Sequence, residues 1–302
     1  MTKSVQVYHY DAFSTEANKG NPAGIVLCGD DLKVEEMQAI ALKVGFNETA
    51  FPRKSNKADL SIRFFTPGHE MNLCGHATIA TLYALKTKGL LQNKTDFTIE
   101  TNAGVLPIKI DNENGDIYIT MQQSTPQFKT FSGSKTDLAN ALGIETSDFD
   151  DDLPIVYGST GVWTLLTPIK NLEVCEKLNP NNELFPSILK EMPHVSIHPF
   201  CMETYHFNTD MHARHFSSPF SGTKEDPVTG TASGVMGAYY IKYIKQRQRV
   251  SNPLTLLIEQ GQEIERDGKV KVEVTTHTDD YDIKISGNAV YVKTFSITLD
   301  DI

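Results

Sequence analysis

Three short segments of the sequence carry residue types suited to proton transfer or anion binding. Residues 46–51 read FNETAF and contain Glu48, residues 74–76 read CGH, and residues 225–231 read EDPVTGT. Carboxylate, imidazole, thiol and hydroxyl groups are the side chains that move protons or act as nucleophiles in enzymes. Each segment is therefore a candidate part of an active site, and each also has a purely structural explanation.

Glu48 is a candidate general acid/base. If residues 46–51 form a strand, side chains alternate between its faces, and Glu48 shares a face with Phe46 and Ala50. A carboxylate in apolar surroundings loses hydration, and desolvation raises the pKa of carboxylic acids toward the range of a general acid/base. The alternative is an edge strand with Glu48 directed into water. The residue pattern favours neither interpretation.

Cys74, Gly75 and His76 stand where an Ala-rich helical segment begins. A cysteine at a helix N-terminus can have a lowered pKa, because the helix dipole stabilises the thiolate. The alternative is a small buried cysteine without chemistry. His76 would lie near the same positive end, either as a catalytic residue or as a helix-end histidine bonded to the backbone.

Residues 225–231 also precede a helical segment. Asp226 or Thr229 could simply cap that helix. The functional interpretation is that Gly230 lets the backbone approach a ligand, while Thr231 offers a hydroxyl and an N–H group to an anion. Residues 20–24, GNPAG, are likewise either another wall of the site, with Asn21 facing the substrate, or a tight turn.

Two of these segments belong to a pattern that occurs twice. Residues 63–78 read RFFTPGHEMNLCGHAT, and residues 214–234 read RHFSSPFSGTKEDPVTGTASG. Each has Arg, Phe, Ser or Thr and Pro, then a polar loop, a glycine and an Ala-rich helix. A strand, a loop and a helix N-terminus made twice predict two similar halves facing one cleft. Two helix N-termini aimed at one point would bind a carboxylate or another anion.

Hydrophobic periodicity supports this two-part organisation. It predicts helices over 34–44, 76–88, 136–142, 171–177, 181–191 and 231–247. It predicts strands over 5–13, 24–27, 60–65, 96–101, 104–110, 116–121, 154–158, 162–167, 195–200, 204–208, 254–259, 269–275, 282–286 and 289–299, and residues 212–217 hold the second Arg-x-Phe. Residues 122–135 are polar and are interpreted as the crossing between the halves. Each half then has one long helix and several strands, which indicates α+β halves with a sheet around a central helix.

Length and charge restrict the class of protein. The 302 residues suggest about two domains, and the net charge of −10 argues against a nucleic-acid partner. Four scattered cysteines without a CxxC pattern favour a reducing, cytoplasmic compartment. We expect neither a signal peptide nor a membrane partner, because no apolar stretch has the required length. No metal is expected, because the histidines at 194, 198, 206, 212 and 215 lack ligand spacing.

Five segments together resemble the PhzF-like phenazine-biosynthesis family, part of the diaminopimelate epimerase-like superfamily. They keep their order along nearly the whole chain: GNPAGIVL at 20–27, GFNETAF at 45–51, RFFTPGHEMNLCGHATIAT at 63–81, EDPVTGTASG at 225–234 and SGNAVYV at 286–292. The resemblance implies two similar α+β domains, each a curled sheet around a helix, with the site between them. We expect domains over 1–125 and 126–287, with residues 288–302 returning to the first. The resemblance also implies a homodimer and no cofactor.

The resemblance also implies roles for individual residues. The family's phenazine enzyme isomerises a dihydro-hydroxyanthranilate by moving a proton. Its catalytic glutamate, histidine and aspartate match Glu48, His76 and Asp226, and its serine after the glycine matches Thr231. We therefore expect Glu48, His76 and Asp226 to be catalytic, and expect a small anionic substrate bound by Asn21, Cys74, Gly75, Gly230 and Thr231.

Cys74 departs from the phenazine enzymes and is similar to the first catalytic cysteine of diaminopimelate epimerase and proline racemase. Those enzymes use two opposed thiols, and the second position here corresponds to Thr229, which disfavours a two-thiol racemase. The leading hypothesis is therefore a cofactor-independent isomerase that shifts a proton on a small carboxylate-bearing, possibly cyclic metabolite. The alternatives are a Cys-dependent racemase, epimerase or dehydratase of an amino acid, and a non-catalytic binding protein.

Overall fold

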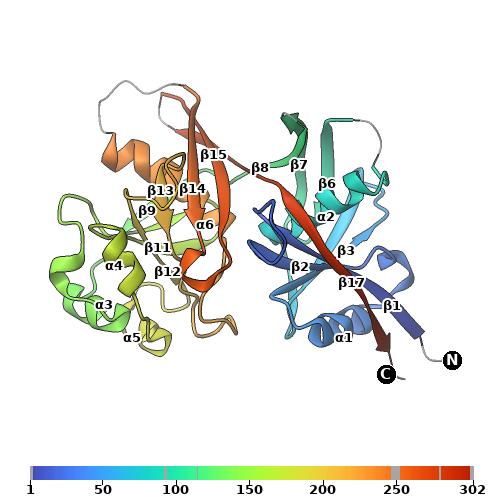
Figure 1. The fold of residues 1–302 in the computed structure, drawn as a ribbon, viewed down its shortest axis with the longest axis horizontal. Helices are drawn as coiled ribbons and strands as arrows, with labels where there is room; N and C mark the ends of the chain where they lie inside the picture. The colour runs from blue at the N-terminus through green and yellow to red at the C-terminus, as the bar shows by residue number, and fades with distance from the viewer. Residues whose placement is uncertain (1–2, 92–93, 114, 246–251, 279, 300–302) are drawn as a thin grey trace. The chain divides into compact units, whose positions relative to one another are not determined.

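The structure is a computed structural model that describes residues 3–91, 94–113, 115–245, 252–278 and 280–299. The chain divides into two compact units (Figure 1). Unit 1 comprises Met1–Gln122 and Ser286–Ile302, and unit 2 comprises Gln123–Ile285. Among the described residues, no helix is both long and apolar enough to cross a membrane.

Unit 1 contains a mixed sheet that the last strand of the chain completes. Its paired strands follow one another in the order β17 (Ala289–Leu299), β1 (Lys3–Ala12), β2 (Asn21–Ile25), β3 (Glu48–Arg53), β4 (Leu60–Phe65), β6 (Asp96–Thr101), β7 (Gly104–Glu113) and β8 (Asp116–Gln122). The β2–β3 and β4–β6 pairs are parallel, and the others are antiparallel. The short β5 (Glu70–Met71) also pairs with β4.

Unit 2 repeats this arrangement. Its strands pair in the order β9 (Gln127–Thr130), β10 (Val156–Ser159), β11 (Trp163–Pro168), β12 (Ser196–Cys201), β13 (Met211–Ala213), β14 (Leu254–Gln260) and β15 (Gly268–Thr276), with β16 (Tyr281–Gly287) next along the chain. The β11–β12 and β13–β14 pairs are parallel and the others antiparallel. Parallel and antiparallel pairs therefore follow one another in the same order from β9 to β15 in unit 2 as from β17 to β7 in unit 1.

Strand register makes the two halves equivalent residue by residue. Phe65, two residues after Arg63, lies opposite Thr49. Phe216, two residues after Arg214, forms an isolated bridge with Ile197. Thr49 of β3 and Ile197 of β12 are therefore equivalent. The residues immediately before them, Glu48 in unit 1 and Ser196 in unit 2, are then equivalent as well. The repeated pattern in the sequence is therefore a repeated structure.

One helix packs against the sheet in each unit. Helix α2 (Gly75–Thr87) contacts β1, β2, β3, β8 and β17 of unit 1, and α6 (Gly230–Tyr239) contacts β10, β11 and β15 of unit 2. Both helices consist largely of small or apolar residues and are buried along most of their length, which is typical of a helix covered on every side rather than on one stripe. This α+β architecture confirms the predicted sheet around a central helix in each unit.

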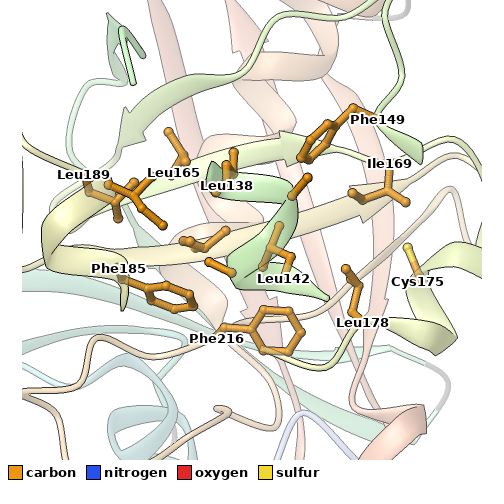
Figure 2. Packing of buried hydrophobic residues seen from close by; sticks show 14 of the residues in the cluster. Leu138, Leu142, Phe149, Leu165, Ile169, Cys175, Leu178, Phe185, Leu189 and Phe216 are labelled. Atoms are coloured by element: carbon orange, nitrogen blue, oxygen red, sulfur yellow. The ribbon is translucent and has the colours of Figure 1, made fainter. Parts of the chain in front are cut away.

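The remaining helices cover outer surfaces and enclose separate cores. Unit 1 has α1 (Val34–Val44) and the 3₁₀ turn η1 (Gly29–Asp31). Unit 2 has α3 (Lys135–Leu142), α4 (Leu172–Lys177), α5 (Phe185–Ile188) and the 3₁₀ turns η2 (Thr146–Asp148), η3 (Asn182–Leu184) and η5 (Gln262–Ile264). Figure 2 shows the core beneath α3, in which Leu138 and Leu142 of one helical face pack near Phe149, Leu165 and Phe185.

Several predicted elements are wrong or differ in length. Residues 204–208 form no strand, because the N–H groups of Tyr205 and His206 donate to the Glu259 carboxylate instead of to a neighbouring strand. In the segment 212–217, which holds the second Arg-x-Phe, β13 ends at Ala213. The predicted crossing at 122–135 contains β9, and the predicted 181–191 helix is reduced to η3 and α5.

The predicted 231–247 helix also changes form before its end. The α-helical part ends at Tyr239, and the π-helical turn η4 (Tyr240–Ile244) follows. Residues 246 and 247 of that prediction lie outside the described residues.

Candidate active site

Glu48 is the first residue of β3, which lies inside the sheet between β2 and β4. The carboxylate belongs to a paired strand, and only 15% of the side chain is exposed. An edge strand with Glu48 directed into water, one of the two interpretations of the sequence, is therefore wrong. The strand begins at Glu48 rather than at residue 46. Ala50 therefore shares a strand face with Glu48 as expected, whereas Phe46 lies before the strand.

The start of α2 brings a thiol and an imidazole to this carboxylate. Cys74 occupies the N-cap position and Gly75 is the first helical residue. His76 Nε2 lies 3.1 Å from Glu48 Oε2, and Cys74 Sγ lies 3.5 Å from His76 Nδ1. The histidine contact has the distance of an ion pair but lacks hydrogen-bond geometry, so the buried Oε2 atom of Glu48 makes no hydrogen bond with the described residues.

Burial decides the protonation of the thiol. It raises the pKa of Cys74, the Glu48 carboxylate raises it further, and His76 only partly offsets these effects. Of the two interpretations of the sequence, the raised pKa favours a small buried thiol over a helix-end thiolate, because desolvation of the buried sulfur is the largest effect on it. Cys74 is a neutral thiol at pH 7.

His76 shows the opposite balance. Burial lowers the pKa of His76, but its contacts with Cys74 and Glu48 raise it more, so the pKa lies well above the ordinary histidine value. The Cys74 sulfur makes the largest of the contributions that raise this pKa, and the Glu48 carboxylate makes the next. The arrangement places a base, a proton donor and the positive end of a helix side by side.

The start of α6 in unit 2 has the same backbone design with different side chains. Thr229 is its N-cap residue, as Cys74 is for α2, and its side chain makes no capping hydrogen bond. Instead, Thr229 Oγ1 donates to Asp226 Oδ2 at 2.5 Å. The equivalence extends into the first turn, where Thr78 Oγ1 donates to the carbonyl of Cys74 and Ser233 Oγ to that of Thr229.

Gln260, which the sequence analysis missed, holds this loop in unit 2. Its Nε2 atom donates to the Asp226 carbonyl at 2.7 Å, and its Oε1 atom accepts from the Thr229 N–H at 3.1 Å. The two bonds fix the backbone that carries the Asp226 carboxylate. Gln260 ends β14, 29 or more residues from this loop in the sequence, and no local pattern connects the two.

An arginine–glutamate pair supports each of the two loops. Arg63 binds Glu70 through Nε and Nη2 at 2.7 and 2.6 Å, and Arg214 binds Glu225 in the same way at 2.9 and 2.8 Å. The glutamates stand four residues before the respective N-cap residues. The repeated arginines therefore position the helix starts through a two-point contact.

Asn21 and the glycines complete the set of predicted site residues. Asn21 is fully buried as the first residue of β2. The preceding Gly20 has φ +73°, and a Cβ there would lie 2.3 Å from the Ala12 carbonyl oxygen, so a tight turn is part of the explanation of this segment. Gly230 is buried at the start of α6, and Thr231 beside it is half-buried.

The structure thus gathers the predicted residues into two groups. Glu48, Cys74 and His76 lie in contact within unit 1, where Asn21 and Gly75 also belong. Asp226, Gly230 and Thr231 belong to unit 2. The histidines have no metal-ligand spacing along the sequence, yet single donor atoms of Glu48, Cys74 and His76 lie within 4.8 Å of one another. These donors come from separate segments of the chain.

Comparison with known proteins identifies the family. The model of the PhzC-PhzF family, phenazine biosynthesis-like protein, matches residues 10–294. The uncharacterized isomerase YfhB of Bacillus subtilis is 53% identical over 292 residues, covering 97% of this chain and 98% of its own. The crystal structure of a Bacillus anthracis phenazine biosynthesis protein of the PhzF family is 57% identical, with a TM-score of 0.96 over 98% of this chain and 100% of its own.

A more distant structure extends the fold comparison. A hydroxyproline epimerase from Agrobacterium vitis has a TM-score of 0.60 at 12% identity, over 99% of this chain and 93% of its own. This likeness concerns the fold alone, and it agrees with the expected diaminopimelate epimerase-like class. The chain belongs to the PhzC-PhzF family of phenazine biosynthesis-like proteins and is an isomerase of that family.

Proposed function

We propose that this isomerase shifts a proton on a small, carboxylate-bearing metabolite without a cofactor, with Glu48 as the acid/base. The observation that carries the proposal is the contact of 3.1 Å between Glu48 and His76 at the start of a buried helix. A carboxylate with an unbonded buried oxygen can accept a proton, and the neighbouring imidazolium can donate one.

The proposed reaction has two steps. Glu48 takes the proton of an acidic C–H bond, and the bonding electron pair is delocalised into the adjoining unsaturated or carboxylate group of the substrate. The resulting carboxylic acid of Glu48 then returns the proton to another carbon. His76 stabilises the negative charge that develops between the steps, together with the positive end of α2.

Asp226 and Thr231 are proposed to contribute to the same reaction from unit 2, as the family resemblance implies. The hydrogen bonds of Thr229 and Gln260 leave Asp226 in a defined orientation, which suits a residue that orients or polarises a substrate. The N–H groups at the start of α6 suit a carboxylate of the substrate. A homodimer is proposed on the resemblance alone and is tested by light scattering of the purified chain.

A thiol-based racemase is the second candidate, favoured by the Cys74–His76 contact of 3.5 Å. Its weakness is that the position equivalent to Cys74 in unit 2 holds Thr229, which cannot act as a base at neutral pH. The raised pKa of Cys74 also opposes a thiolate.

Proton exchange tests the proposal directly. The purified chain is incubated in deuterium oxide with a panel of small unsaturated, cyclic and amino carboxylates, and NMR follows the loss of each C–H signal. We expect exchange with one class of substrate, abolished in Glu48→Gln and retained in Cys74→Ser. Proton exchange that is lost in Cys74→Ser but retained in Glu48→Gln would contradict the proposal and favour the thiol-based racemase.

The fate of the migrating proton tests the one-base mechanism. A substrate deuterated at the migrating position is converted in ordinary water. A single carboxylate returns part of the deuterium to the product on the same face, because a water-free site limits exchange with solvent. A product with inverted configuration would contradict a single base.

A further inference from the structure

Three different metal-binding groups converge at the start of α2. A carboxylate oxygen of Glu48, the sulfur of Cys74 and a ring nitrogen of His76 lie within 4.8 Å of one another. Among residues 3–91, 94–113, 115–245, 252–278 and 280–299, no other group of three or more His, Cys, Asp or Glu side chains has donor atoms this close. The three donors come from a strand and a helix that the sheet and its packing hold together.

The spacing of these donors fits a tetrahedral ion. Zinc bonds of about 2.0–2.2 Å to nitrogen or oxygen and about 2.3 Å to sulfur place neighbouring donors roughly 3.3–3.6 Å apart. His76 Nε2 lies 3.1 Å from Glu48 Oε2, and Cys74 Sγ lies 3.5 Å from Nδ1 and 3.9 Å from Nε2 of the same ring. All three donors lie within 4.8 Å of one another, so side-chain adjustment that brings Cys74 Sγ and Glu48 Oε2 to one ring nitrogen of His76 would place them on one ion.

The surroundings also favour an ion. The Cys74 side chain is buried and the Glu48 Oε2 atom is buried without a hydrogen bond, so water has already been removed from these donors. A thiolate, a carboxylate and a neutral imidazole carry two negative charges, which a divalent cation neutralises. Mixed sulfur, nitrogen and oxygen donors suit Zn²⁺ or Co²⁺ rather than Mg²⁺ or Ca²⁺.

Unit 2 provides an internal comparison. The positions equivalent to Glu48, Cys74 and His76 are Ser196, Thr229 and Thr231. Three neutral hydroxyl groups are poor ligands for a borderline-soft ion. Within the part of the chain that the structure describes, the duplicated scaffold therefore has this donor set in unit 1 and lacks it at the equivalent positions of unit 2.

We propose that Glu48, Cys74 and His76 bind one Zn²⁺ ion per chain and that the bound ion inhibits the isomerase. Binding rests on the geometry alone, whereas inhibition rests on the proposed function, since the ion occupies the groups assigned to proton transfer. The Cys74 thiol and the His76 imidazolium each release one proton to solvent when the Zn–S and Zn–N bonds form, and no oxidation or reduction takes place. Three protein ligands leave the fourth coordination position to water.

Titration of the full, metal-free chain with Co²⁺ tests the binding. A thiolate bound to Co²⁺ produces a charge-transfer absorption band in the near ultraviolet. We expect one equivalent of Co²⁺ to saturate this band and Zn²⁺ to displace it. Cys74→Ser should abolish the band, whereas Cys28→Ser, which alters an exposed cysteine, should leave it unchanged. A band that survives in Cys74→Ser, or no band at all, would overturn the site.

Two further measurements keep the proposal testable if Cys74→Ser does not fold. Glu48→Gln and His76→Gln should each weaken Co²⁺ binding by at least about tenfold, the lower range for disturbing even the outer partners of a metal site. Unchanged affinity in both variants would contradict the ligand set.

Stoichiometric Zn²⁺ should also suppress proton exchange by the wild-type chain, and EDTA should restore it. Full activity with Zn²⁺ bound would refute the proposed inhibition but would leave the proposed binding site unaffected.

Discussion

The starts of α2 and α6 share a backbone but differ in chemistry. Both follow an Arg-x-Phe sequence and an arginine–glutamate pair, and both have an N-cap residue whose carbonyl accepts a hydrogen bond from a hydroxyl of the first turn. Unit 1 places Glu48, Cys74 and His76 there, whereas unit 2 has Ser196, Thr229 and Thr231 at the same positions. Conversely, Asp226 of unit 2 stands where unit 1 has Met71, immediately after the paired glutamate.

The difference shows how a duplicated scaffold can divide its tasks. In unit 1, the acidic and basic groups contact one another and are available for proton transfer. In unit 2, the carboxylate of Asp226 and the helix start are held by Thr229 and Gln260. The repeated part supplies geometry, and under the proposed function the residues that were not repeated supply the reaction.

The comparison of the two units predicts that activity depends on Glu48 of unit 1 and not on the residue at the equivalent position of unit 2. Glu48→Gln should reduce kcat by about 10²–10⁴, the typical effect of removing a general acid/base. Ser196→Ala, at the equivalent position of unit 2, removes one hydrogen bond to Thr164 and should change activity little. Proton exchange measures both variants, and circular dichroism checks their folding. Equal losses in the two variants would contradict the division of tasks.

The two arginine–glutamate pairs should differ in their contribution to stability. Arg214 is 7% exposed and also donates to the carbonyls of Cys175 and Leu178, whereas Arg63 is 19% exposed. Arg214→Met should lower the free energy of unfolding by about 3–5 kcal/mol, because a buried partner loses its counter-charge. Arg63→Met should cost about 1.5–3 kcal/mol. Urea unfolding of both variants measures the order, and equal losses in the two variants would show that burial does not determine it.

A buried histidine near Arg214 should make unit 2 sensitive to alkaline pH. His212 lies 2.8 Å from Glu263 and 3.4 Å from Glu259. Burial lowers the pKa of His212, but the two glutamates more than offset this effect and raise it to about 9. The equivalent position in unit 1, two residues before Arg63, is Ser61.

The sign of this effect follows from the raised pKa. The stabilisation by protonated His212 is complete below the ordinary pKa of 6.5 and is lost as pH rises through about 9. The loss should approach about 3 kcal/mol. Unfolding measured from pH 6 to 10 in the wild type and in His212→Gln isolates it, because other titrating groups cancel in the difference. Parallel curves would show that the pKa of His212 is the same in the folded and the unfolded chain, and would contradict the raised value.

The smallest effect on activity is expected at the pair Cys74 and Thr229. The raised pKa keeps Cys74 a neutral thiol at pH 7, so Cys74→Ser should lose less than about tenfold in rate, well below the effect of an acid/base. Thr229→Ser, which keeps the hydroxyl that binds Asp226, is the matched change in unit 2. Complete loss in Cys74→Ser with an intact fold would restore the thiol-based racemase.

Local sequence predicted the elements of the fold well where periodicity was strong. The helix over 34–44 and the strands over 60–65 and 96–101 have the predicted bounds. The strand over 204–208 was wrong because a side chain distant in sequence, Glu259, binds its backbone. Contacts such as those of Gln260 and Glu48 depend on strand pairing, which no single segment of the sequence encodes. The proximity of Glu48 to His76 therefore needed the structure.

The pairing of β17 with β1 also has a consequence for synthesis on the ribosome. Its register joins residues near both ends of the chain, from Lys3 opposite Leu299 to Ala12 opposite Ala289. Unit 2 is one continuous segment, so it can complete its sheet first although it is made second. At about 5–20 residues per second, β1 must remain without this neighbour for roughly 10–30 s while unit 2 is made. During that interval, the edge of β1 that later pairs with β17 is unpaired and exposed. This edge is a surface to which chaperones could bind in the nascent chain and which is covered in the folded protein.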